Sequence, residues 1–462
     1  MIQLRHRQPS LCDAFWSEEV SDLWEPWMRV ADRLLEDEAL LDHVYDAQAK
    51  RHKHSRTRGR KQTPAEIVLR LLILKHARNW SYDVLEREVR ANLVYRDFTR
   101  IGSQKVPDAK TLIRIGRVLG PEVIEQLHGR MVNLARERKV IQGRRLRVDT
   151  TVVESNIHYP TDSSLLADGA RVLTRTMKRV GKAVGGMKTK LRDRLRTIRK
   201  QSLAITLSAK QKDERAEERR RQTYRKMISV TRNIINQAKR VIEEVSTRRR
   251  PKVKALRAEL GTMIGRVEQV IRQTKARVFD GNLHAEKLVS VFESHSEIIR
   301  KGKANRPNEF GNLVKIQEAE HQIITHYEVF AQRPSDSELL ISAVETHQQQ
   351  LGKMPQMVAA DAGFYSAANE RALQELGVKR VSVPSRNTRS QERRRMQKSR
   401  WFRRAQKWRT GCEGRISALK RHGLRRCLYR GFTGMQRWVG LGVIADNLIN
   451  IASRLVSRPR NR

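Results

Sequence analysis

Residues 144–154 have the sequence RRLRVDTTVVE, and this stretch decides the class of fold. Leu146 and Val148 alternate with polar residues and the β-branched run Thr150–Val153 follows, a pattern that favours a β-strand with Asp149 inside it. Later strands are expected at 288–292, 312–317, 323–330, 357–360 and 378–383, and helices at 338–349 and 367–376. Because strands come first and then alternate with helices, the sequence predicts an α/β fold with a mixed sheet.

The sequence that precedes this strand has a helical pattern. An amphipathic helix is expected over 20–50, and a basic linker follows at 52–61. The tetrapeptide TPAE at 63–66 predicts a helix start, because it combines an N-cap, a proline at the first helical position and an acid three residues after the cap. Further helices are expected after Ser81 and over 108–120. Three short helices suit either a helix-turn-helix or an ordinary bundle.

A long helical segment separates the strand at 144–154 from the later strands. Apolar residues recur at every third or fourth position over 180–198, 227–245 and 256–270, which predicts three helices folded back on each other. Turns are expected at Leu207–Ser208 and at Pro251, since proline disfavours helix in the residue before it. The other faces of these helices carry mostly arginine and lysine.

The positive charge is concentrated in two segments. The chain has 462 residues, enough for about two to four domains, and a net charge of +45. Residues 171–280 carry 33 basic and 10 acidic side chains, and residues 386–430 carry 17 basic and 2 acidic ones. Such clustering predicts contacts with nucleic acid, with protein-binding basic helices as the alternative. Residues 1–50, with 5 basic and 11 acidic side chains, are instead expected to dock on the protein's own basic surface or on a second protomer.

The sequence gives no indication of a membrane or secreted protein. No stretch is expected to supply the roughly 20 apolar residues that span a bilayer, and the first residues, MIQLRHRQPSLCDAFW, lack the apolar core of a signal peptide. Cys12, Cys412 and Cys427 have no CxxC spacing, so reduced thiols are expected in place of disulfides or a zinc site. These features predict a cytoplasmic protein with no membrane partner.

Three acidic residues stand out by their surroundings. Asp149 lies inside a predicted strand, and Asp361 ends another, at the edge where α/β sheets bind ligands. Glu413 is one of 2 acids among the 17 bases of 386–430. On a helix, Arg409, Glu413 and Lys420 would lie within about 40° of one another.

Carboxylates that converge from two strands and a helix would form an oxygen-only site. Such a site suits Mg²⁺ or Mn²⁺, and a pair of ions would clamp the attacking and leaving oxygens of phosphoryl transfer. The alternative is that Asp149 and Asp361 are solvent-facing strand acids and Glu413 is a surface ion pair.

Six other residues are secondary candidates. His158, Tyr159 and Asp162 follow the first strand and could shape a site. Glu154 and Asp168 are near enough to Asp149 in sequence to compete for its role. Asp446 lies among aliphatic residues and is expected to cap or pair within the core.

Several motifs resemble one family. The run VDTTVVESNIHYPTDSSLLADG, the context AADAGFYS and the pattern Arg409-x3-Glu413-x6-Lys420 resemble the DDE transposases of bacterial insertion sequences, near the ISNCY-type branch. The resemblance covers most of 60–452. It includes QTPAEIVLRLLILKHARNWSYDVLEREV, HSEIIRKGK and the closing WVGLGVIADNLINIA.

The resemblance implies a fold and an activity. The fold is an RNase H-like mixed sheet core with an all-helical N-terminal domain and a long basic helical insertion. The triad falls on Asp149, Asp361 and Glu413, with two divalent ions (Mg²⁺ or Mn²⁺), and Arg409 and Lys420 are expected to bind DNA. The implied enzyme cuts DNA at the terminal inverted repeats of a mobile element and joins the freed 3′-OH ends to target DNA, in DNA transposition and recombination.

The expected domains follow from this organisation. They are an acidic helical arm and basic linker at 1–60, a helical DNA-binding domain at 61–140, the catalytic core at 141–164 and 286–452, the basic insertion at 165–285 and a basic tail at 453–462. A homodimer is expected, since transposition holds two element ends together, as is a bacterial, nucleoid-associated cytoplasmic location.

One position departs from the family pattern. Related transposases often place a tyrosine three residues before the motif arginine, where this chain has Gln406. A base-stacking role would then fall to Trp408 or Trp401. The competing functions are a non-catalytic basic nucleic-acid-binding protein, such as a transposase relic, and a nuclease that cuts without joining.

Overall fold

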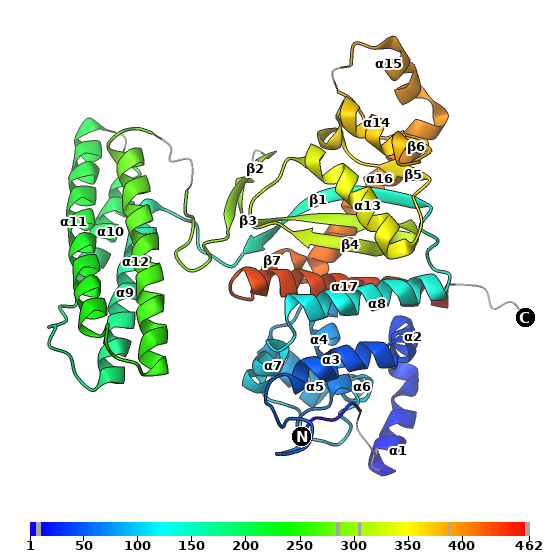
Figure 1. Cartoon of the computed structure of the whole chain (residues 1–462), viewed down its shortest axis with the longest axis horizontal. Coiled ribbons are helices and arrows are strands. Elements are labelled where there is room, and N and C mark those ends of the chain that lie inside the picture. The colour runs from blue at the N-terminus through cyan, green and yellow to red at the C-terminus, as the bar shows by residue number, and fades with distance from the viewer. Residues whose placement is uncertain (6–10, 212, 283–286, 304–305, 387, 458–462) are drawn as a thin grey trace, which may run out of the picture. The chain divides into compact units, whose positions relative to one another are not determined.

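The computed structural model describes every residue except 6–10, 212, 283–286, 304–305, 387 and 458–462, and leaves the side chains of 11, 12 and 301–307 undescribed. The chain forms two compact units. The main unit comprises Met1–Ser155 and Gly311–Arg462, and the inserted unit comprises Asn156–Phe310. Each unit is described by itself (Figure 1).

A mixed sheet is the centre of the main unit. Its strand order is β2-β3-β1-β5-β6, with β4 also paired to β3 and β7 to β1; β2 and the first residues of β3 belong to the inserted unit. β1 is antiparallel to β3 and parallel to β5, and β5 is parallel to β6. The strands are β1 (Arg145–Ser155), β2 (Glu297–Lys303), β3 (Arg306–Glu318), β4 (Ile324–Val329), β5 (Met357–Ala359), β6 (Arg380–Ser382) and β7 (Arg426–Cys427).

The two faces of the sheet bury different apolar clusters. Leu146 and Val148 of β1 pack with α13 (Leu339–Leu351) and α14 (Ala367–Glu375). Val153, an odd-numbered position on the same strand, packs in a cluster with residues of α16 (Arg400–Leu419) and α17 (Phe432–Val456). Because side chains alternate along a strand, Arg147 and Asp149 belong to the α16 face.

The N-terminal helices pack on α17, which lies between them and the sheet in Figure 1. Contacts join α17 to α2, α4, α8 and β4. The helices are α1 (Leu11–Glu19), α2 (Pro26–Leu34), α3 (Glu38–Ala49), α4 (Ala65–Ala77), α5 (Tyr82–Ala91), α6 (Leu93–Phe98), α7 (Ala109–Gly116) and α8 (Pro121–Glu137).

The acidic N-terminal segment docks within its own unit. Asp32 pairs with Arg70 at 2.6 Å and with Arg100 at 2.8 Å, and Asp37 pairs with Arg130 at 2.7 Å. Met28 of α2 is fully buried in the same core. This confirms the expectation that the segment docks on the protein itself, although apolar packing contributes as well as charge.

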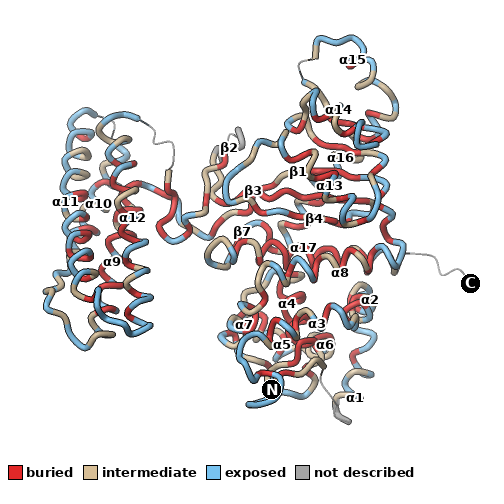
Figure 2. The backbone as a smooth tube through the Cα atoms, in the orientation of Figure 1, coloured by how far each residue is buried: buried red, intermediate tan, exposed pale blue. Residues whose placement is uncertain are grey.

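The inserted unit is a helical bundle followed by β2. Its helices are α9 (Asp162–Val184), α10 (Leu195–Ser208), α11 (Glu214–Glu244) and α12 (Pro251–Val278). Their apolar stripes form one core, and Figure 2 shows the buried inner faces and exposed outer faces.

The main strand and helix predictions are confirmed, with differences in the N-terminal part. The strands at 144–154, 312–317, 323–330, 357–360 and 378–383 overlap β1, β3, β4, β5 and β6. The single helix over 20–50 was wrong: Pro26 begins α2, and the Asp37 side chain caps α3. The N-cap of α4 is Pro64, one residue later than predicted. The helix over 108–120 ends at Gly116, and α6 was not predicted.

Two predictions in the inserted unit were wrong. Residues 288–292 form no strand; the Gln273 side chain bonds both backbone groups of Leu288, at 3.0 Å each. An apolar run this short does not distinguish a strand from a packed loop. The bundle has a fourth helix, because Gly185 and Gly186, at φ 78° and 138°, end the helix that was expected to continue through 180–198.

The expectation about apolar stretches was wrong for α17. By length and composition this helix could cross a membrane. In the structure 67% of its apolar window is buried, against α2, α4, α8 and β4, which is how a core helix packs. Cys412 and Cys427 are buried, and neither forms a disulfide within the described part of the chain; the side chain of Cys12 lies outside that part.

Candidate active site

Asp149 lies in the middle of β1 on the face that meets α16. Its side chain is 14% exposed, and Oδ1 accepts a hydrogen bond from the Thr150 backbone N–H at 2.8 Å. Burial raises the pKa of Asp149 to about 6, and the negative charges of Asp361 and Glu413 act in the same direction. The Thr150 N–H and the Arg409 guanidinium oppose this rise. Asp149 is therefore electrostatically coupled to both other carboxylates of the predicted triad.

Asp361 follows β5 at the same edge of the sheet. β1 and β5 pair in parallel as Arg145 with Met357 and Arg147 with Ala359. Continuing that register by two residues sets Asp149 opposite Asp361. The Asp361 side chain also caps a short 3-10 turn, since Oδ1 accepts the Gly363 N–H at 2.7 Å. Two carboxylates thus share one edge of the sheet.

Helix α16 brings Arg409 and Glu413 to this edge. Arg409 Nη1 lies 3.8 Å from Asp149 Oδ2, and its side chain is 17% exposed. Glu413, one helical turn further on, is exposed. Lys420 was predicted to lie on the same helix, but α16 ends at Leu419, so Lys420 is its C-cap and the first residue of a π-turn.

Gln406 fastens α16 to the strand ends. Its Nε2 donates to Ser382 O at 2.6 Å, to Ser382 Oγ at 3.0 Å and to Ala360 O at 3.4 Å. Ala360 immediately precedes Asp361, and Gln406 lies one turn before Arg409. The glutamine in the family's tyrosine position therefore connects the helix to the end of β5.

A buried ion pair lies beneath Asp149. The Arg147 guanidinium, 3% exposed, donates to the Glu318 carboxylate and to Trp408 O, and lies 5.0 Å from the Trp408 ring centroid. Burial raises the pKa of Glu318 to about 7, although Arg147 opposes the rise. A Cβ at Gly411 would lie 2.9 Å from Arg147 Nη1. The absence of a side chain at Gly411 therefore allows α16 to approach β1.

A second buried pair joins α16 to α17. Arg415 and Asp446, both nearly inaccessible, form an ion pair, and His422 Nδ1 lies 2.8 Å from the same carboxylate oxygen. This confirms the expectation that Asp446 pairs within the core. The helix with Arg409 and Glu413 is held on two sides by buried polar contacts.

Asp336 is a further acid at the strand ends that the sequence reasoning missed. Thr150 Oγ1 donates to its Oδ1 at 3.4 Å. Burial raises the pKa of Asp336, as does the charge of Asp361. A Cβ on Gly363 would lie 3.1 Å from Asp361 Oδ1 and 3.2 Å from Asp336 Oδ2. The residue belongs to a capping box, SDSE, which in sequence indicates only a helix start.

The donor chemistry of this edge suits a hard divalent cation. Aspartate and glutamate oxygens are the ligands that Mg²⁺ and Mn²⁺ prefer, and mutual repulsion among carboxylates is relieved by a cation. Within the described residues, no group of three or more His, Cys, Asp or Glu side chains is close enough to hold a metal ion as it stands. Asp149 and Asp361 are the two carboxylates that the register of β1 and β5 sets opposite each other.

The secondary candidates take part in other contacts. Glu154 pairs with Arg426 at 3.3 Å. In the inserted unit, Asp168 pairs with Arg171 at 2.5 Å and with His158 at 3.5 Å, and Asp162 pairs with Arg277 at 3.1 Å. These contacts are those of structural ion pairs.

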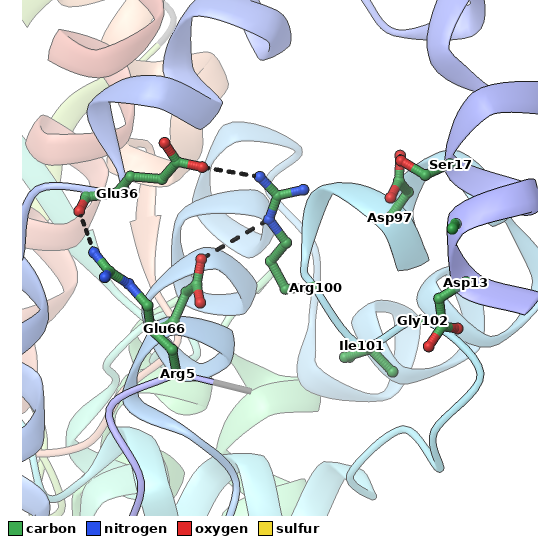
Figure 3. A pocket seen from close by; sticks show the side chains of 10 residues that line it. Arg5, Asp13, Ser17, Glu36, Glu66, Asp97, Arg100, Ile101 and Gly102 are labelled. Carbon is green, nitrogen blue, oxygen red and sulfur yellow. Dashed lines mark hydrogen bonds and ion pairs between the residues drawn. The ribbon is translucent and has the colours of Figure 1, made fainter. Parts of the chain in front are cut away.

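One hollow lies among the N-terminal helices, away from the strand ends (Figure 3). Its volume is about 530 Å³. Arg100 pairs with Glu36 at 3.2 Å, and Arg5 donates to Glu36 O at 2.7 Å. Charged groups in its wall thus pair with one another, which is typical of a pocket that has only a structural role. Its lining comprises Arg5, Asp13, Ala14, Ser17, Glu36, Glu66, Asp97, Arg100, Ile101 and Gly102.

Two family models match the chain. Residues 27–117 match a transposase domain, DUF772, and residues 374–452 match a transposase DDE domain. Together, the two matches support a DDE transposase of an insertion sequence. The second match contains Glu413 and Arg409, whereas Asp149 and Asp361 lie outside both matches. No curated protein and no solved structure matches the chain.

Proposed function

We propose that this transposase cuts DNA at the terminal inverted repeats of its insertion sequence and joins the freed 3′-OH ends to target DNA, using Asp149, Asp361 and Glu413 as catalytic carboxylates. The observation that carries the proposal is the parallel register of β1 and β5, which aligns Asp149 with Asp361. The charge of Glu413 also acts on the pKa of Asp149, which supports Glu413 as the third carboxylate of the triad.

Each residue has a defined role in the proposed reaction. Two Mg²⁺ or Mn²⁺ ions would activate the attacking oxygen and stabilise the leaving oxygen of phosphoryl transfer. Asp149 and Asp361 offer the oxygens that hold them, with Glu413 completing the set from α16. Arg409 and Lys420 would bind the phosphates of the DNA.

The rest of the chain is proposed to serve the same reaction. The mixed sheet with carboxylates at adjacent strand ends supports an RNase H-like core, and the helices α4 to α8 are proposed to bind the element end. A homodimer would hold the two ends together. Action on bacterial DNA places the proposed site of activity in the cytoplasm, at the nucleoid.

Strand cleavage on labelled DNA with the element's terminal repeat tests the proposal. We expect nicking at the repeat boundary with Mg²⁺ or Mn²⁺, none with EDTA, and none in Asp361→Asn. Asparagine is also a good N-cap, so this variant keeps the turn that Asp361 closes. Glu154→Gln, on the same strand as Asp149 and outside the triad, is the matched control and should cut normally.

Two outcomes would overturn this assignment. Cleavage that persists in folded Asp149→Asn, Asp361→Asn and Glu413→Gln proteins would exclude the triad. Salt-sensitive DNA binding by the wild type with no cutting in either metal would support the alternative, a non-catalytic DNA-binding relic. Cutting without joining would identify a nuclease.

A further inference from the structure

One end of the inserted unit concentrates positive charge. The connection from α9 to α10 and the turn from α11 to α12 meet there, because Glu244 accepts hydrogen bonds from Lys188 N at 2.5 Å, Thr189 N at 2.9 Å and Thr189 Oγ1 at 2.6 Å. We call the two segments, 182–196 and 244–257, the basic tip. Together they contain 12 basic and 2 acidic residues.

Both acids of the basic tip are already engaged. Glu244 holds the backbone and side chain of Thr189, and these hydrogen bonds lower its pKa. Asp193 pairs with Lys178 at 2.6 Å and caps Leu195 N at 3.0 Å. Neither carboxylate is left to neutralise the outer cations. The exposed basic positions of the tip are Lys182, Lys188, Lys190, Arg192, Arg196, Arg248, Arg249, Arg250, Lys252 and Lys254.

The backbone of the basic tip is anchored. Gln237, 6% exposed, donates from Nε2 to Lys190 O at 2.8 Å and accepts from Arg194 Nη1 at 3.3 Å. Arg257 Nη1 donates to Ser246 O. Val245 and Val253, on either side of the turn, are buried in the bundle core. The cations are therefore presented by a fixed scaffold and not by a loose tail.

The turn from α10 to α11 has a different charge balance. Residues 209–221 contain six basic and four acidic side chains. Arg221 pairs with Glu217 at 3.2 Å, and Arg225, just beyond, is 3.5 Å from Glu218. This turn, at the other end of the bundle, thus carries a smaller excess of positive charge than the basic tip.

We propose that the basic tip is a binding site for the phosphate backbone of double-stranded DNA, an inference that rests on the proposed function for the identity of the DNA. A cluster of lysines and arginines without opposing acids releases counterions when it meets phosphates. The tip contains no aromatic residue, so it has no platform on which single-stranded bases could stack. Contacts of this kind position DNA without reading its sequence.

Charge reversal on the full-length protein tests the site. Arg248→Glu, Arg249→Glu and Lys252→Glu are combined in one variant; all three positions are exposed, and an acid at position 252 in the first turn suits the dipole of α12. The matched control combines Lys210→Glu, Arg215→Glu and Arg219→Glu in the same unit. Far-ultraviolet circular dichroism and thermal unfolding check that both variants fold as the wild type does.

Affinity for a random-sequence duplex is measured across a salt series in EDTA. We expect the tip variant to bind about tenfold or more weakly, with a log Kd against log salt slope smaller by about 2 to 3, since each lost phosphate contact removes about 0.9. The control should change far less in both quantities. Equal losses in the two variants would show a general charge effect and overturn the proposal, as would an unchanged slope in the tip variant.

This experiment separates the inference from the proposed function. Binding in EDTA requires no catalysis, so a tip-specific loss would support the site even if the protein never cut DNA. Conversely, metal-dependent cutting by the wild type together with an unchanged tip variant would support the proposed function and refute the site.

Discussion

Gln406 gives the sharpest test of how the candidate active site is assembled. Its amide donates to Ser382 O at 2.6 Å, to Ser382 Oγ at 3.0 Å and to Ala360 O at 3.4 Å. Alanine removes all three contacts and preserves the helix, since alanine has the highest helix propensity. The change therefore loosens α16, which carries Glu413, from the strand end that leads into Asp361.

The expected loss of stability is small. Ser382 O keeps a second donor, the Ala360 N–H at 3.2 Å, so the substitution does not leave this buried carbonyl without a partner. One net hydrogen bond is worth about 1 kcal/mol, and the contact at 3.4 Å adds little. We expect Gln406→Ala to lower the free energy of unfolding by about 1 to 2 kcal/mol.

The expected loss of activity is larger. A displacement of about 1 Å in a catalytic group can reduce the rate about 100-fold, and Gln406 sets the distance between the helix and the strand ends. We expect the cleavage rate at saturating DNA to fall about 10- to 100-fold with little change in DNA affinity, because Gln406 makes no DNA contact in the proposed function.

Single-turnover cleavage and thermal unfolding of three variants provide the assay. Lys407→Ala, at the exposed neighbouring position, is the control and should keep the wild-type stability and the wild-type cleavage rate at saturating DNA. Gln406→Glu keeps the shape and loses the donor, so its carboxylate would face two carbonyl oxygens and its activity should fall at least as far as that of Gln406→Ala. A Gln406→Glu protein with the wild-type cleavage rate would refute the reasoning, as would a fully active Gln406→Ala protein with the expected loss of stability.

Two further predictions concern stability. Burial acts to raise the pKa of Glu320, but hydrogen bonds from its own backbone N–H and from those of residues 142–144, the latter at 2.7 to 3.2 Å, outweigh it and lower the pKa. The stabilisation is thus present above the ordinary pKa of 4.5 and lost as the pH falls through the lower folded-state value; Glu320→Gln should lose about 1 to 3 kcal/mol at pH 7 and less in acid, and equal losses at pH 7 and pH 3 in urea unfolding would contradict this. Gly411→Ala should destabilise the protein by about 1 to 3 kcal/mol, because the new Cβ would clash with Arg147. Gly414→Ala, with nothing within 4 Å of its Cβ, should instead stabilise it by up to about 1 kcal/mol. Changes in thermal stability of the same sign in both variants would contradict this prediction.

Local patterns predicted the strands that carry the carboxylates. Alternation around Asp149 was enough for β1, and the residues before Asp361 were enough for β5. The sequence also singled out Arg409, which the structure places against Asp149. Whether these residues are catalytic stays a prediction.

Contacts between distant segments could not be predicted. Arg147 and Glu318 meet because β1 and β3 pair in register, although they are 171 residues apart. Gln406 was notable in sequence only as a missing tyrosine, because its acceptors lie in β6 and just after β5, far from it along the chain. Asp336 lies in a capping box, which in sequence indicates only the start of a helix, and only the fold brings it near Asp361.

The contacts that anchor α16 explain how this helix can bring Arg409 and Glu413 to the sheet edge that already carries Asp149 and Asp361. Burial is the main cause of the raised pKa of Asp149, and the charges of Asp361 and Glu413 add to it; ionised carboxylates at this edge therefore repel one another, which acts against the approach of α16. Arg409 offsets part of this repulsion, while Gln406, the Arg147 contacts and the Arg415–Asp446 pair hold α16 at separate points along its length. Weakening any one anchor should therefore change the distance of Glu413 from the strand ends before it unfolds the protein, and activity should be lost before stability.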